Sequence, residues 1–272
     1  MKWVERATKL ILVLAMLGSC FWLEYYTYQS QETILQIQKE VGNKKKPEEI
    51  TTGTTLENEE KKKEQSKKVA YLTFDDGPSK VTERILDVLE VYDIPATFFL
   101  IGCNITEERV PVIERMIENK NAIGIHTYCH KAKEIYSSTQ SYLEDLEKTK
   151  ERIYEVTGKE VFMIRFPWGS ANNYLKKIED SLLPTLEEKG YYYCDWNVSA
   201  EDSIGKPTRY SILQNVKKDF NRYDNPIVLM HDSATSSLTA EMLPDIIVML
   251  KEAGYQFDTL DHMDKPYQYP RD

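Results

Sequence analysis

Short apolar runs alternate with amphipathic stretches along the chain from residue 69 onward. The runs are rich in β-branched and aromatic side chains, which favours buried strands. Seven runs are expected to form strands: residues 69–74, 96–101, 122–125, 161–165, 191–198, 227–230 and 255–260. Six stretches with apolar residues at helical spacing are expected to form helices: residues 82–92, 109–119, 141–156, 181–189, 211–220 and 240–253.

This alternation predicts an α/β fold with a parallel sheet. The sheet could close into a (β/α) barrel of about seven parallel strands, one short of the usual eight. An open, doubly wound sheet is the alternative. No glycine-rich phosphate loop follows a predicted strand, which argues against nucleotide binding.

Residues 1–28 are expected to direct the chain to a membrane. Three basic residues, Lys2, Arg6 and Lys9, precede an uncharged stretch over residues 10–23 that is followed by aromatic side chains. An uncleaved membrane anchor is the favoured interpretation. A cleaved signal peptide and a lipoprotein modified at Cys20 remain open. All three place the rest of the chain outside the cytoplasm, either anchored to the membrane or secreted to the cell wall.

Residues 29–68 are expected to be a charged linker, because residues 39–68 contain nine Lys, seven Glu and no aromatic side chain. Residues 69–272 would then form the folded domain. The whole chain has 272 residues, a formal charge of −9 and a mean hydropathy of −0.52. These values exclude a polytopic membrane protein and argue against a nucleic-acid partner.

Reactive side chains follow the predicted strands where each strand ends. In chain order they are Asp75, Asp76, His126, His130, Arg165, Asp202 and His231. The carboxyl ends of parallel strands meet on one face, where active sites are built. These side chains are therefore expected to form one site, and three of the four histidines belong to it.

The residue types suggest metal-assisted hydrolysis. Asp76, His126 and His130 could bind a divalent cation and leave a position open for water. Asp75 could act as a base toward that water, and His231, held by Asp202, could act as an acid. The alternative is a set of polar residues that only cap loops and turns.

Five sequence motifs then identify a resemblance. TFDDGP (73–78), HTYCH (126–130), RFPWG (165–169), DWNVSAEDS (195–203) and LMH (229–231) occur in order. Together they resemble carbohydrate esterase family four, the polysaccharide deacetylases with a NodB-type domain. The resemblance covers residues 69–260.

The resemblance implies a deformed (β/α) barrel and a divalent metal, commonly zinc, bound by Asp76, His126 and His130. It implies that Asp75 is the base, that His231 is the acid, that Arg165 orients Asp75 and that Asp202 tunes His231. The implied substrate contacts are made by three further residues: Pro167 and Trp168 line the groove, with the Trp168 N–H holding the oxyanion, and Leu229 shapes the pocket for the acetyl methyl group.

Two positions depart from the family pattern: Cys129 stands where serine is usual, and Ser203 replaces an aromatic wall residue. We expect a monomer that hydrolyses N-acetyl groups of an extracytoplasmic glycan, with peptidoglycan N-acetylglucosamine as the favoured substrate. Chitin oligomers and acetylated xylan are alternative substrates. A non-catalytic glycan-binding module and a structural wall protein are alternative functions.

Overall fold

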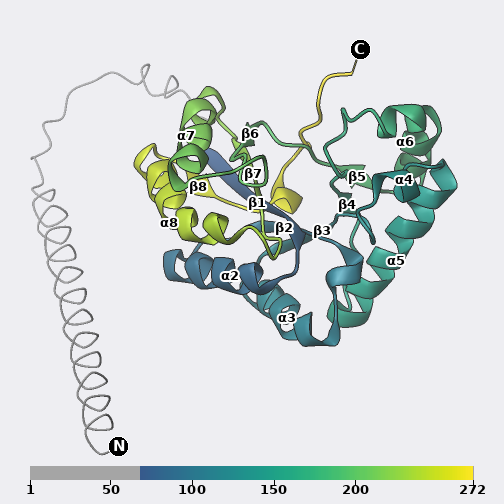
Figure 1. Cartoon of the computed structure of the whole chain (residues 1–272), viewed down its shortest axis with the longest axis horizontal. Coiled ribbons are helices and arrows are strands. Elements are labelled where there is room, and N and C mark those ends of the chain that lie inside the picture. The colour runs from purple at the N-terminus through teal and green to yellow at the C-terminus, as the bar shows by residue number, and fades with distance from the viewer. Residues whose placement is uncertain (1–67, 272) are drawn as a thin grey trace, which may run out of the picture. The chain divides into compact units, whose positions relative to one another are not determined.

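The computed structural model describes residues 68–271 of the chain (Figure 1). Eight strands are present in this part of the chain: β1 (Val69–Gly77), β2 (Thr97–Leu100), β3 (Ala122–Ile125), β4 (Met163–Ile164), β5 (Tyr192–Tyr193), β6 (Val198–Ser199), β7 (Ile227–His231) and β8 (Gln256–Phe257). Every strand pair is parallel. The predicted α/β class is confirmed.

The strands form one curled sheet in the order β5-β4-β3-β2-β1-β7-β6, and β8 pairs with the first residues of β1. β5 and β6 are the two ends of this order, so the barrel is open between them. The sequence predicted a deformed barrel of about seven parallel strands, and this architecture is confirmed.

Helices surround the outside of the curled sheet (Figure 1). The helices of the described residues are α2 (Lys80–Tyr92), α3 (Val110–Glu118), α4 (Ala132–Ile135), α5 (Thr139–Thr157), α6 (Glu179–Glu188), α7 (Arg209–Asp219) and α8 (Ser237–Glu252). α2 shows why they form where they do: the Ser79 hydroxyl caps its first turn, and Ile85, Leu86 and Leu89 are buried on one face. The short helix α4 was not expected from the sequence.

The run at residues 191–198, predicted as one strand, is two strands at opposite ends of the sheet. β5 pairs with β4 and β6 pairs with β7, so residues 194–197 cross the opening of the barrel. The crossing residues have other hydrogen-bond partners: the Cys194 and Asp195 carbonyls accept from the Arg165 side chain. These long-range contacts override the local strand pattern, and the prediction of a single strand was wrong.

The predicted anchor, 1–28, and the predicted linker, 29–68 apart from Lys68, lie outside the described residues. Within residues 68–271, no helix has the length and apolar character needed to cross a membrane.

Candidate active site

The carboxyl ends of the strands bring the predicted reactive residues together. Asp75 lies near the end of β1, beside His231 in the register of the β1–β7 pair. His126 follows β3 directly, and Arg165 follows β4. The site is therefore built on the sheet itself rather than on a single loop.

Asp76, His126 and His130 form a compact group of metal-ligating type. One ligand atom from each lies within 4.8 Å of the others. The Asp76 Oδ1 atom is 3.5 Å from Nε2 of His126 and 3.5 Å from Nε2 of His130. Two imidazole nitrogens and one carboxylate oxygen are a common donor set for catalytic divalent metals.

The protonation state of His126 is the one that a metal ligand requires. Its Nδ1 atom is 2.8 Å from the Arg165 carbonyl oxygen, which can only accept, so Nδ1 carries the proton. This leaves the Nε2 lone pair facing Asp76. Burial lowers the pKa of His126 to about 3, so the ring is neutral at physiological pH.

The Asp76 carboxylate also presents a potential metal ligand. Its Oδ1 atom is buried and has no hydrogen-bond partner among residues 68–271. Its backbone has a φ of 78°, in a region that L-residues rarely occupy, and Asn104 Nδ2 donates to its carbonyl at 2.9 Å. A buried, unpartnered carboxylate oxygen is costly unless something balances its charge. A divalent cation between Asp76 and the two imidazoles would fit this arrangement.

Asp75 is buried against a buried cation. Arg165 Nη1 donates to Asp75 Oδ1 at 3.1 Å and to the Thr73 hydroxyl at 2.7 Å. The guanidinium also lies over the Phe99 ring, 4.2 Å from its centroid. Burial raises the pKa of Asp75, while the charges of Arg165 and His231 act in the opposite direction. Arg165 therefore fixes the orientation of Asp75 and favours its ionised form.

His231 is fixed by Asp202. The His231 Nδ1 atom is 2.8 Å from Asp202 Oδ1, and the His231 backbone N–H donates to Asp202 Oδ2 at 2.8 Å. The Thr239 hydroxyl donates to the same Oδ2 at 2.5 Å. Burial acts to lower the pKa of His231, but the hydrogen bond and charge of Asp202 outweigh it and raise the pKa to about 9. The imidazole is thus held as a proton donor.

One aromatic side chain lines the open side of the site. Trp168 is 50% exposed, and its ring centroid is 4.7 Å from that of His130. Tyr174, whose ring centroid lies 5.9 Å from that of Trp168, extends this surface. Across the site, Ser203 is exposed and lies 3.3 Å from His231 Nε2. Aromatic rings therefore lie beside His130, whereas the residue next to His231 Nε2 is the small Ser203.

Two of the residues predicted to contact substrate, Pro167 and Leu229, are buried. Pro167 directly precedes the exposed Trp168. Its contact with substrate stays a prediction. Leu229 is 6% exposed on β7 and aligns with Thr73 of β1. Sequence patterns assigned no role to Thr73, Asn104, Thr239 or Tyr174, because their contributions depend on contacts between distant segments.

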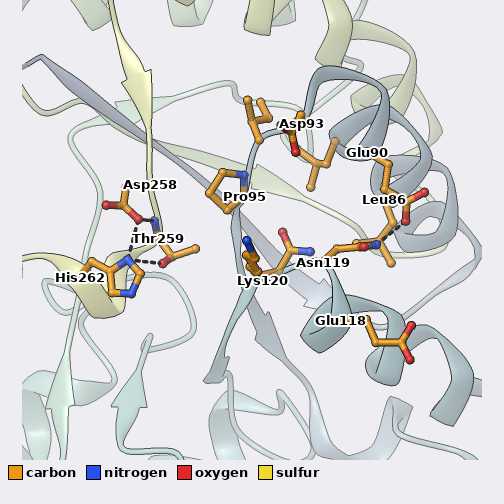
Figure 2. A pocket seen from close by; sticks show the side chains of 13 residues that line it. Leu86, Glu90, Asp93, Pro95, Glu118, Asn119, Lys120, Asp258, Thr259 and His262 are labelled. Atoms are coloured by element: carbon orange, nitrogen blue, oxygen red, sulfur yellow. Dashed lines mark hydrogen bonds and ion pairs between the residues drawn. The ribbon is translucent and has the colours of Figure 1, made fainter.

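A cavity of about 500 Å³ lies elsewhere on the molecule (Figure 2). It is bordered by residues at the amino ends of β2 and β3, such as Pro95 and Asn121. Its histidine, His262, donates from Nδ1 to Oδ1 of the half-buried Asp258 at 2.7 Å, a hydrogen bond that raises the pKa of His262. None of the strand-end residues borders this cavity, so the reactive cluster and this cavity are separate.

The chain is similar to known deacetylases. A family model described as polysaccharide deacetylase matches residues 62–184. A peptidoglycan-N-acetylglucosamine deacetylase of Bacillus cereus is 29% identical over 276 residues, covering 94% of this chain and 93% of the relative. The peptidoglycan-N-acetylmuramic acid deacetylase PdaA of Bacillus subtilis is 30% identical over 203 residues, covering 72% of each.

Solved structures show the same likeness. The catalytic domain of peptidoglycan N-acetylglucosamine deacetylase from Eubacterium rectale aligns with a TM-score of 0.69 and 33% identity, covering 76% of this chain and 94% of that domain. The likeness thus extends over nearly the whole of the aligned domain in fold and in sequence.

Proposed function

Because this chain belongs to the polysaccharide deacetylase family and deacetylates peptidoglycan or a related polysaccharide, we propose that its substrate is the N-acetylglucosamine of peptidoglycan, outside the cytoplasm. The observation that carries the proposed chemistry is the position of Asp75. Its Oδ2 lies 3.9 Å from Nε2 of His126, it is aligned with His231 in the β1–β7 pair, and Arg165 donates to its Oδ1 at 3.1 Å.

Asp76, His126 and His130 would hold a divalent metal, with zinc as the first choice for two imidazoles and one carboxylate. When bound, the metal polarises the acetyl carbonyl and makes water more acidic. The unpartnered Asp76 Oδ1 and the neutral His126 ring support this assignment.

The side chains of this protein would then divide the reaction between them. Asp75 removes a proton from the attacking water, and Arg165 keeps its carboxylate oriented. The Trp168 N–H donates to the developing oxyanion. His231 gives its proton to the leaving nitrogen, and the negative charge of Asp202 stabilises its protonated form. The products are acetate and a free amine on the sugar.

The small residue beside His231 and the relatives named as peptidoglycan deacetylases support peptidoglycan as the substrate. Peptidoglycan carries lactyl and peptide groups that chitin and xylan lack. Trp168 offers a face for a sugar ring, while the opposite side at Ser203 is small and exposed. Chitin oligomers and acetylated xylan remain alternative substrates for the same chemistry.

We also propose that residues 1–28 anchor the chain to the membrane, that residues 29–68 act as a spacer toward the wall, and that residues 69–272 form the catalytic domain. The relative from Bacillus cereus aligns over 94% of this chain, which supports an arrangement shared along its length. The chain would work as a monomer, since one copy contains the whole cluster.

Product analysis tests the substrate assignment. Purified peptidoglycan is treated with the metal-loaded full chain, cut enzymatically into soluble fragments that keep their acetyl groups, and analysed by mass spectrometry. We expect glucosamine residues lacking acetyl groups, with muramic acid still acetylated. Deacetylated muramic acid alone would overturn the assignment to N-acetylglucosamine. Deacetylation of chitin oligomers or xylan without any action on peptidoglycan would overturn the peptidoglycan assignment.

A further inference from the structure

The loop that carries Trp168 has a backbone conformation that a tryptophan does not favour. Trp168 has a φ of 65° and Gly169 a φ of 77°, so two consecutive residues are left-handed. This costs free energy at Trp168, whose Cβ crowds the backbone there. The neighbours of the loop must therefore hold it. The Trp168 N–H itself has no hydrogen-bond partner in the described part of the chain.

Asp195 holds this loop from one side. Its side chain is fully buried, and neither of its carboxylate oxygens lacks a partner. Oδ1 accepts from the Ser170 N–H at 2.8 Å. Oδ2 accepts from the Ser170 hydroxyl at 2.5 Å and from the Tyr269 N–H at 3.0 Å. A buried carboxylate with three donors is a strong anchor for the segments that supply them.

The same residue also contacts the arginine that orients Asp75. Arg165 Nη2 donates to the Asp195 carbonyl at 3.2 Å, and the Asp195 N–H donates to the Tyr267 carbonyl at 2.8 Å. Asp195 thus connects Arg165, the Trp168 loop and the C-terminal segment. It lies in the stretch that crosses the opening of the barrel, where no strand pairing would otherwise hold the chain.

Close packing adds to the hydrogen bonds of Asp195, and we call these contacts on the Trp168 loop together the clamp. A Cβ at Gly169 would lie 2.9 Å from the Trp196 ring and 3.2 Å from the Tyr269 ring, so the loop backbone rests directly on these side chains. On the other side, Asn172 Nδ2 donates to the carbonyls of Gly169 at 2.7 Å and Pro167 at 3.1 Å. The peptide between Pro167 and Trp168 therefore has little freedom to rotate.

We propose that Asp195 is a positioning residue for deacetylation, which holds the Trp168 N–H in the orientation needed to donate to the oxyanion. This rests on the proposed function. The oxyanion forms only as the reaction proceeds, so a misplaced N–H weakens binding of the transition state more than binding of the substrate. Loss of Asp195 should therefore appear in kcat and not in KM.

The variant Asp195→Asn tests this. It keeps the size of the side chain but replaces one acceptor oxygen with an NH₂ group. With the metal-loaded full chain and a soluble N-acetylglucosamine oligomer, we expect kcat to fall by about 100-fold and KM to stay within about twofold. Asp180→Asn, which changes an exposed carboxylate on α6, should behave as the wild type. An unchanged kcat, or a loss confined to KM, would overturn the proposal.

Ser170→Ala tests the same contacts with a milder change, in case Asp195→Asn fails to fold. It deletes the hydroxyl donor and keeps the Ser170 N–H, so kcat should fall by about fivefold at constant KM. An unchanged kcat in this variant as well would count against the clamp.

Backbone hydrogen exchange of residues 166–172 gives a readout that does not depend on turnover. Exchange should be faster in Asp195→Asn than in the wild type, and equal rates would overturn the clamp. If the wild type released no acetate, the proposed function would fail, while the exchange rates would still decide whether Asp195 holds the loop.

Discussion

His231 and Asp202 are joined by two hydrogen bonds, both 2.8 Å long: one from the imidazole Nδ1 to Oδ1, the other from the backbone N–H to Oδ2. Because the carboxylate accepts from Nδ1, the proton available for transfer is on Nε2. The pair thus fixes both the tautomer and the direction of the predicted proton donor.

This relationship predicts the alkaline limb of the pH–rate profile. His231 must be protonated to act as an acid, and its pKa is raised to about 9. The rate should therefore fall as pH rises through about 9. In Asp202→Asn the charge that raises this pKa is gone, so the limb should move at least about one unit lower.

The measurement is kcat against pH with the metal-loaded enzyme. Asp261→Asn, an exposed carboxylate in a short turn after β8, provides the matched control and should leave the limb in place. If Asp202→Asn kept the wild-type limb, His231 would not be the group that titrates there.

The aromatic rings beside His130 predict an effect on substrate binding. Trp168→Ala removes the half-exposed ring beside His130, so KM for a glycan oligomer should rise by about tenfold, with a smaller change in kcat. Tyr154 on α5 is also 50% exposed and offers a matched control. Equal KM values for Trp168→Ala and Tyr154→Ala would show that the ring does not contact the substrate.

The close approach of Gly77 and Asp232 predicts that substitutions at the two positions have coupled effects on stability. A Cβ at this position would lie 2.1 Å from Asp232 Oδ2, and Asp232 is fully buried. Gly77→Ala should therefore lower the free energy of unfolding by about 1–3 kcal/mol, as measured in urea. Asp232→Ala removes the obstructing carboxyl, so the double variant should lose less than the sum of the two single losses. Strictly additive losses would mean that another contact excludes a side chain at Gly77.

The fold class and the reactive cluster could be predicted from the sequence, because both follow from local patterns along the chain. Apolar runs mark buried strands, and the residues that directly follow parallel strands converge at one edge of the sheet. The proximity of Asp76, His126 and His231 could therefore be predicted. The reason for a glycine at position 77 depends instead on a distant residue, because the Asp232 side chain approaches it closely.

Features that depend on distant segments could not be predicted. The strand at residues 191–198 is divided because Arg165 and the C-terminal segment take the hydrogen bonds of Cys194 and Asp195. The burial of Pro167 and the role of Asn172 follow from the packing of one loop against several elements. Local periodicity contains no information about such contacts.

The most direct test of metal-dependent deacetylation is acetate release from peptidoglycan as a function of added metal. The full chain is first stripped with a chelator, then titrated with zinc, alongside an Asp76→Ala variant. Release should be absent without metal and should rise to a plateau at one equivalent per chain, while Asp76→Ala should bind zinc far more weakly and stay inactive. Acetate release that persists undiminished after chelation, or an Asp76→Ala variant that binds zinc and works like the wild type, would contradict the central claim.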